Sequence, residues 1–194
     1  MDLSRYSDPV ERSIVNEIVQ WSKVALEKPN PSFNNLPACP YSKKALADNK
    51  ISVVFKYEAS YRAVYTAIDE YDDTFDLCIV IDLKNTKNSD EFHEYLDHLN
   101  TVIAAGTFVD RDKWVMGFHP DDEESEFVQD IDFEPSTGGE YSMIFVQRLS
   151  KLQEAADKLD KKGYYDGYDE ESNWQEIYAR RTELHRRLKN GDET

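Results

Sequence analysis

Apolar residues recur every three or four positions in several segments of the chain. This spacing places them on one face of an α-helix. In the first such segment, Ser7-Asp8-Pro9 offers a side-chain acceptor and then a proline, the usual composition of a helix N-terminus. The pattern predicts helices over about residues 9–27, 61–71, 89–106, 145–159 and 174–188.

Three shorter segments lack the helical spacing and are rich in β-branched, aromatic and other apolar residues. They cover residues 51–57, 77–81 and 114–118, and their composition suits β-strands. Residues 77–81 are apolar without alternation, as expected of a strand covered on both faces in a parallel sheet. Strands therefore alternate with helices, which is typical of right-handed βαβ crossovers.

These elements predict an α/β fold with a small sheet of three or four mostly parallel strands flanked by helices. We expect the α/β domain to occupy residues 1–162, and residues 163–194 to form a C-terminal helical tail. The last predicted helix has an apolar stripe that would dock on the domain or on a second copy of the chain. A homo-oligomer formed through this helix is therefore one expectation.

Charge and composition narrow the classes of partner. Among 194 residues, 39 are acidic and 23 are basic, which gives a formal net charge of −16. Such a field repels nucleic-acid backbones and anionic membranes, so direct nucleic-acid binding is not expected. The first residues lack the pattern of a signal peptide, and no apolar run approaches the roughly 20 residues of a membrane span. The sequence predicts a cytoplasmic protein.

A candidate site follows the strand at 114–118, which ends in His119, Pro120 and Asp121. Asp82 comes directly after the strand at 77–81. Binding and catalytic groups of α/β sheets gather at the carboxyl ends of parallel strands. We therefore expect Asp82 and His119 to share that edge of the sheet.

Several chemical roles are open to this site. His119 suits a general base, a ligand of a divalent metal beside Asp121 and Asp82, or the partner that activates Cys39. The catalytic set would then be Cys39, His119 and Asp121. The alternative for His119 is a strand-end histidine whose ring is hydrogen-bonded to the main chain.

Cys39 has two interpretations of its own. It precedes a short predicted helical turn that carries Lys43 and Lys44, and a helix N-terminus and nearby cations both lower a thiol pKa. The alternative is a buried structural cysteine. The only other cysteine is Cys78, so the chain has neither a disulfide framework nor a paired zinc spacing, which fits a reducing compartment.

The chain resembles an uncharacterised bacterial family of unknown function over about residues 10–160. That family has a tryptophan on its first helix, a Leu-Cys-Pro-Phe-Ala turn, a Phe-His-Pro-Asp strand end and a Ser-Pro-Tyr-Pro-Met element. The matching positions here are Trp21, Ala38–Ser42, Phe118–Asp121 and Glu140–Met143. The prolines of the last element are missing. The resemblance implies a shared fold and shared motifs and assigns no reaction.

A second resemblance concerns the cysteine turn. Cys39-Pro40-Tyr41-Ser42 is similar to the Cys-Pro-Tyr-Cys motif of glutaredoxins in a one-thiol form, and Gly138-Gly139 is similar to a later glycine pair of that family. It implies thiol-redox chemistry through Cys39. The chain departs from that family by placing a proline-rich loop before Cys39 and by lacking its Thr-Val-Pro loop.

Three functional hypotheses follow. The first is a small enzyme or ligand-binding protein that binds a small molecule at the strand ends through Cys39, His119 and Asp121. The second is a non-catalytic acidic module that binds a protein partner through its negative surface. The third is a thiol-redox protein acting through Cys39. The first requires Cys39 and His119 to lie within a few ångströms of each other, and the second does not.

Overall fold

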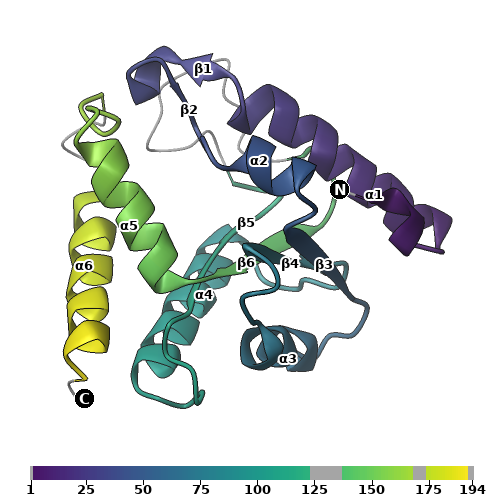
Figure 1. The fold of residues 1–194 in the computed structure, drawn as a ribbon. Helices are drawn as coiled ribbons and strands as arrows, with labels where there is room; N and C mark the ends of the chain where they lie inside the picture. Colours follow the sequence, from purple (N-terminus) through teal and green to yellow (C-terminus); the bar gives the residue numbers. More distant parts are fainter. Residues whose placement is uncertain (1, 123–136, 168–173, 192–194) are drawn as a thin grey trace.

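The computed structural model describes residues 2–122, 137–167 and 174–191. Figure 1 shows a four-stranded sheet at the centre, with helices packed on both of its faces and two further helices beside it. The predicted α/β class is confirmed in this coarse form.

The sheet is mixed rather than mostly parallel. Its strands are β3 (Ile51–Lys56), β4 (Leu77–Asp82), β5 (Trp114–Phe118) and β6 (Ser142–Gln147), and they lie in the order β3-β4-β6-β5. Strands β3 and β4 are parallel, whereas β6 is antiparallel to both of its neighbours. The prediction of a mostly parallel sheet is therefore wrong, because β6 lies between β4 and β5.

Strand β6 lies partly within the segment predicted as a helix over residues 145–159. The predicted helix included the four-residue spacing between Phe145 and Leu149. In the structure, Phe145 belongs to β6, whereas Leu149 is the first residue of α5 (Leu149–Asp160). Because β6 is a central strand covered on both faces, most of its residues are buried without alternation. An uninterrupted apolar run of this length fits a strand or a helix equally well.

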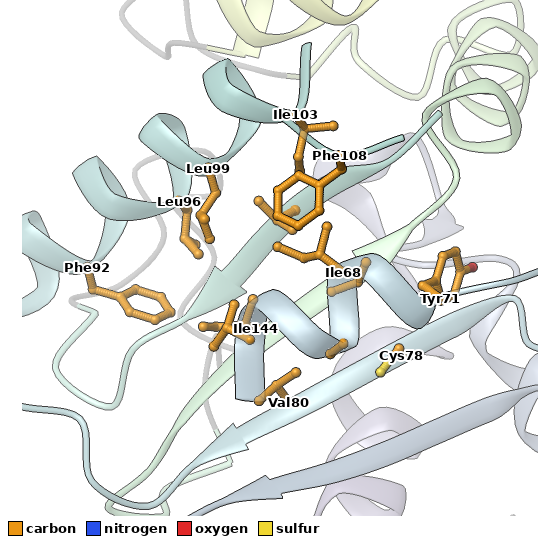
Figure 2. Close-up of a cluster of buried hydrophobic side chains, with 14 residues drawn as sticks. Ile68, Tyr71, Cys78, Val80, Phe92, Leu96, Leu99, Ile103, Phe108 and Ile144 are labelled. Carbon is orange, nitrogen blue, oxygen red and sulfur yellow. The ribbon is translucent and has the colours of Figure 1, made fainter. Parts of the chain in front are cut away.

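Helices α3 (Arg62–Glu70) and α4 (Ser89–Ala104) cover one face of the sheet. Helix α4 begins with a capping box in which Asn88 and Glu91 bond each other's main-chain N–H groups. Figure 2 shows the apolar cluster under these helices. The cluster includes Ile68, Val80, Phe92, Leu96, Leu99, Ile103 and Ile144.

The opposite face carries α1 (Pro9–Trp21) and α2 (Ser42–Ala47). Asp8 caps α1 by accepting the N–H groups of Val10 and Glu11, and a wider π-helical turn, Ser22–Leu26, continues it. The helix predicted over residues 9–27 is thus confirmed. The cluster beneath these helices includes Ile18, Trp21, Ile79, Ile81 and Phe145.

Short elements complete the part of the chain that precedes the sheet. Strands β1 (Pro29–Asn30) and β2 (Leu36–Pro37) pair antiparallel in a two-residue ladder. The 3₁₀ turns η1 (Leu3–Arg5) and η3 (Pro31–Phe33) lie in the N-terminal segment and between β1 and β2, respectively. Together β1, η3 and β2 form the connection that leads to Cys39.

Helix α6 (Trp174–Asn190) lies alongside α5 in Figure 1. The hydroxyl of Tyr178 donates to Asp157 of α5 at 2.7 Å, and Arg180 pairs with Asp97 of α4 at 3.1 Å. The predicted last helix is confirmed. Dimerisation through this helix stays a prediction. No helix in the described ranges is both long and apolar enough to span a membrane.

Candidate functional site

Three strands end at one edge of the sheet. Since β4 and β5 are both antiparallel to β6, they run in the same direction as each other and as β3. Asp82 and His119 therefore lie at the same edge, although the sheet is mixed. We call this the carboxyl edge.

A row of buried polar residues crosses the carboxyl edge. Lys56 is in register with Asp82, and Asp82 is in register with Ser142. Cross-strand partners point to the same face of a sheet, and here it is the face covered by α3 and α4. The exposed fractions are 1% for Lys56, 1% for Asp82 and 0% for Ser142. We call these three residues the strand-end row.

One half of the strand-end row is an ion pair. The Nζ of Lys56 donates to Oδ1 of Asp82 at 2.8 Å, and the main-chain N–H of Lys84 donates to the same oxygen at 2.9 Å. The Lys56 ammonium also lies 5.0 Å from the centre of the Tyr61 ring. Lys56 and one carboxylate oxygen of Asp82 therefore have their partners within the chain.

The other half of the row is incomplete. Neither Oδ2 of Asp82 nor Oγ of Ser142 has a hydrogen-bond partner among the described residues. A buried polar atom without a partner costs about 1–3 kcal/mol in lost solvation. These two atoms belong to residues that are directly opposed on neighbouring strands, so the uncompensated groups lie together.

Two tyrosines and a lysine lie beside the row. The Tyr61 and Tyr95 ring centres are 4.3 Å apart, and the Nζ of Lys87 is 5.7 Å from each of them. Burial raises the pKa of both tyrosine hydroxyls, and the negative charge of Asp82 adds to the increase. The environment of the row is thus aromatic on one side and cationic at Lys87.

His119 is held by main-chain groups. Its Nε2 lies 2.9 Å from the carbonyl of Lys87, and its Nδ1 accepts the N–H of Asp121 at 3.1 Å. This geometry assigns the neutral tautomer with the proton on Nε2. The ring also packs against Phe92 at 5.5 Å. The structure therefore has the alternative in which the His119 ring is hydrogen-bonded to the main chain. Neither ring nitrogen is left to act as a general base.

The predicted metal ligands do not come together. His119 is occupied by the main chain, Asp82 is paired with the Lys56 cation, and the Asp121 carboxylate is exposed, 3.7 Å from Nδ1 of His119. Within residues 2–122, 137–167 and 174–191, no group of three or more His, Cys, Asp or Glu side chains is placed to hold a metal ion. The structure therefore does not assemble His119, Asp121 and Asp82 into the predicted metal site.

Cys39 lies in a different layer from His119. Its main-chain N–H donates to Leu26 at the end of the π-helical turn, on the α1 and α2 side, whereas His119 packs on α4. The predicted pairing of Cys39 with His119 is thus not formed. Burial raises the pKa of the Cys39 thiol, and Lys44 pairs with Asp48. A reactive thiol requires the opposite shift.

Sequence reasoning selected Asp121, but the carboxylate that accepts hydrogen bonds within the turn after β5 is that of Asp122. Its Oδ1 accepts from Ser89 at 2.6 Å and from His93 at 2.9 Å, and its Oδ2 accepts the N–H of His119 at 2.7 Å. Burial would raise the pKa of Asp122, but the hydrogen bonds from His93 and Ser89 lower it. Because Ser89 and His93 contact the same oxygen, they do not form a nucleophile and base.

No protein-family model, curated protein or solved structure matches the chain. The resemblances to the bacterial family and to glutaredoxins therefore stay predictions. The candidate site depends on the geometry of this chain alone.

Sequence reasoning missed Lys56 and Ser142. Ser142 was missed because β6 was assigned partly to a helix, which removed its first residue from the carboxyl edge. Lys56 offered a usable signal: it is the penultimate residue of the strand predicted at 51–57, and Asp82, of opposite charge, directly follows the strand predicted at 77–81. In parallel register such residues are adjacent, which predicts an ion pair at the strand ends.

Proposed function

We propose that the protein binds a small polar ligand at the strand-end row. Asp82 Oδ2 and Ser142 Oγ are the contacting atoms, and Lys56 holds the Asp82 carboxylate in position. The observation that supports this is the pair of unpartnered buried atoms on opposed residues. Roughly 90% or more of buried polar groups in native proteins have a hydrogen-bond partner. Two adjacent exceptions favour a partner supplied from outside the chain.

The chemistry of the two atoms defines the ligand class. An ionised carboxylate only accepts hydrogen bonds, whereas a serine hydroxyl donates or accepts. The ligand therefore presents an O–H or N–H to Asp82, with the same or a neighbouring atom contacting Ser142. Tyr61 and Tyr95 supply aromatic surface for the remainder of the molecule. Small hydroxyl and amino compounds meet these requirements.

Entry requires movement of the residues that lie beside the row. Tyr61 is the residue before α3 and has no side-chain capping bond there, and Lys87 lies in the connection between β4 and α4. Neither belongs to a strand or helix interior. We therefore assign ligand entry to a displacement of Tyr61 and Lys87 and not to separation of the strands.

The proposal is binding and includes no reaction. His119 lacks a free ring nitrogen, and Lys56 is held as the cation of an ion pair. The raised pKa of Cys39 disfavours the thiol-redox hypothesis. The acidic interaction module is the competing hypothesis, since it needs only the net charge of −16 and no interior site.

Saturation-transfer NMR with ethanolamine, serine and glycerol tests the proposal. At least one compound is expected to bind saturably, and Ser142→Ala is expected to weaken it about tenfold, the effect of losing one hydrogen bond of about 1.4 kcal/mol. The matched control is Ser42→Ala, which removes a buried hydroxyl on the opposite face of the sheet.

The outcomes separate the hypotheses. Binding that is weakened about tenfold in Ser142→Ala and unchanged in Ser42→Ala supports the strand-end row as the site. Absence of binding by all three compounds, or equal binding by the two variants, overturns the proposal and leaves the acidic interaction module as the better hypothesis.

A further inference from the structure

A second place in the molecule has the composition of a binding site. A cavity of about 280 Å³ lies between α4, α5 and α6, away from the carboxyl edge. Its apolar lining includes Ile103, Leu149, Leu184 and Leu188, and Arg111 and Arg187 contribute guanidinium groups. We propose that this cavity binds a small amphipathic anion, namely a carboxylate with a short alkyl chain.

The charge of the cavity is opposite to that of the whole chain. The protein has 39 acidic and 23 basic residues. Among the described residues that line the cavity, however, none is acidic and three are basic: Arg111, Lys113 and Arg187. An anion repelled by most of the surface therefore meets a local concentration of positive charge here.

Arg111 is the strongest individual indication. It is half-buried, and its guanidinium lies so close to Gly106 that a Cβ there would be 2.7 Å from a terminal nitrogen. No described carboxylate pairs with it: neighbouring Asp110 pairs with Arg148, and Asp112 accepts from Ser150. In a chain with an excess of carboxylates, this arginine lines a cavity without an acidic partner.

Arg187 and Lys113 extend the positive charge. Arg187 uses its Nε to bond Glu183 at 2.8 Å, and no described bond involves its terminal nitrogens. The Nζ of Lys113 donates to the main-chain carbonyls of Ile68 and Asp69. Lys113 therefore contributes charge that Asp110, 4.0 Å away, partly offsets, while Arg111 and Arg187 have the N–H groups to bind a carboxylate directly.

The apolar lining defines the rest of the ligand. Leu184 and Leu188 lie one helical turn apart on α6, and they face the same cavity as Leu149 of α5 and Ile103 of α4. The volume is near the lower end of the roughly 300–1,000 Å³ typical of small-molecule sites. A short alkyl chain such as that of octanoate fits this description better than a long-chain lipid.

Calorimetric titration of the full chain with octanoate and octanamide tests the proposal, because the two differ in charge and hardly in shape. We expect saturable binding of octanoate, and binding of octanamide weaker by about tenfold or more, the loss of one charge-assisted contact. No saturable binding of octanoate, or equal affinity for both compounds, overturns the proposal.

Variants locate the site. Arg111→Gln and Arg187→Gln are each expected to weaken octanoate about tenfold. The matched control is Arg186→Gln, which also removes an arginine that pairs with Glu183 on α6 but lies outside the lining. If Arg186→Gln weakens binding as much as the other two, the assignment to this cavity is wrong.

A variant that fills the cavity distinguishes loss of binding from loss of folding. Ala104 lines the cavity at the end of α4, and Ala104→Leu adds bulk there without removing a polar contact. It is expected to abolish octanoate binding while thermal unfolding stays cooperative. Unchanged binding in this variant contradicts the proposal. Ser142→Ala should leave octanoate binding unchanged, because Ser142 does not line this cavity. The proposal for the cavity and the proposal for the strand-end row are therefore tested independently.

Discussion

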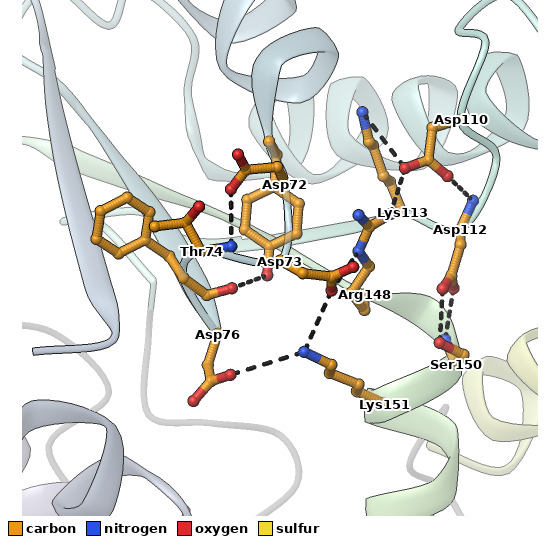
Figure 3. A network of polar contacts seen from close by, with 12 residues as sticks. Asp72, Asp73, Thr74, Asp76, Asp110, Asp112, Lys113, Arg148, Ser150 and Lys151 are labelled. Carbon is orange, nitrogen blue, oxygen red and sulfur yellow. Dashed lines mark hydrogen bonds and ion pairs between the residues drawn. The ribbon is translucent and has the colours of Figure 1, made fainter. Parts of the chain in front are cut away.

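Polar side chains are hydrogen-bonded to different extents at the two ends of the sheet. Figure 3 shows the end at which β4 and β5 begin, where acidic and basic side chains bond one another. Arg148 pairs with Asp110 and, at 3.3 Å, with Asp73, and Asp112 accepts from the N–H and the hydroxyl of Ser150. We call these five residues the amino-end network.

The comparison separates structural polar groups from available ones. The amino-end network is partly exposed and no atom of it is buried without a partner within the described residues. The strand-end row is more deeply buried and leaves Asp82 Oδ2 and Ser142 Oγ unpartnered. A fold that needed only stability would complete its bonds first where burial is deepest. The distribution observed here is the reverse, and it is the reason for proposing that the carboxyl edge binds a ligand.

The largest expected effect comes from breaking the buried ion pair. Asp82→Asn leaves the Lys56 ammonium buried without a counter-charge, and such a loss destabilises a protein by about 3–5 kcal/mol. The double variant Lys56→Met with Asp82→Leu removes both charges and should recover most of this loss. Urea unfolding measures both. A loss below about 1 kcal/mol in Asp82→Asn contradicts a desolvated pair.

The amino-end network should depend on Arg148 and much less on its exposed neighbour. The Arg148 side chain is 12% exposed and pairs with two carboxylates, so Arg148→Met should cost about 1.5–3 kcal/mol. Lys151 pairs with Asp73 but is 53% exposed, and Lys151→Met should cost below about 1 kcal/mol. Equal losses in urea unfolding of the two variants would show that burial does not govern this network.

A smaller, pH-dependent effect is expected where the turn after β5 meets α4. The hydrogen bond to Asp122 raises the pKa of His93, so the folded state favours protonated His93. Its stabilising contribution is complete below the unfolded pKa of about 6.5 and is lost as the pH rises through the raised folded value. Because His93 is 49% exposed, screening limits the effect to below about 1 kcal/mol.

The variant His93→Gln measures this contribution. It should lower the free energy of unfolding more at about pH 5.5 than at about pH 8.5, on either side of the ordinary histidine pKa. His98→Gln is the matched control, because His98 is exposed on the same helix and has no described bond to Asp122. A loss that is the same at both pH values contradicts the ion pair.

The sequence allowed the prediction of elements with local signals. Asp8 and Pro9 marked the start of α1, the apolar steps of α4 marked its buried stripe, and those of α6 marked a half-buried one. Those signals come from residues within a few positions of each other. The order of the strands is set by contacts between distant segments, and the uninterrupted apolar run of β6 did not distinguish a strand from a helix.

The sequence allowed the location of the candidate site to be predicted, but not the roles of its residues. The shared edge of Asp82 and His119 followed from the strand ends, and it holds although the sheet is mixed. The roles did not follow, because which ring nitrogen of His119 is occupied depends on the carbonyl of Lys87, more than thirty positions away. Ser142 entered the site only through its register with Asp82.

The smallest expected change is also the most decisive. Replacing Ser142 by alanine removes a buried hydroxyl that has no partner within the described residues, so the free energy of unfolding in the absence of ligand should stay the same or rise by up to about 1 kcal/mol. Replacing Ser42 removes a hydroxyl that donates to the carbonyl of Cys39 at 2.9 Å, and this should cost about 1 kcal/mol. Urea unfolding of the two variants side by side gives the comparison directly. A loss of 1 kcal/mol or more in Ser142→Ala, on the scale of a typical hydrogen bond, would show that the hydroxyl stabilises the fold and would contradict its role as a position kept for a ligand.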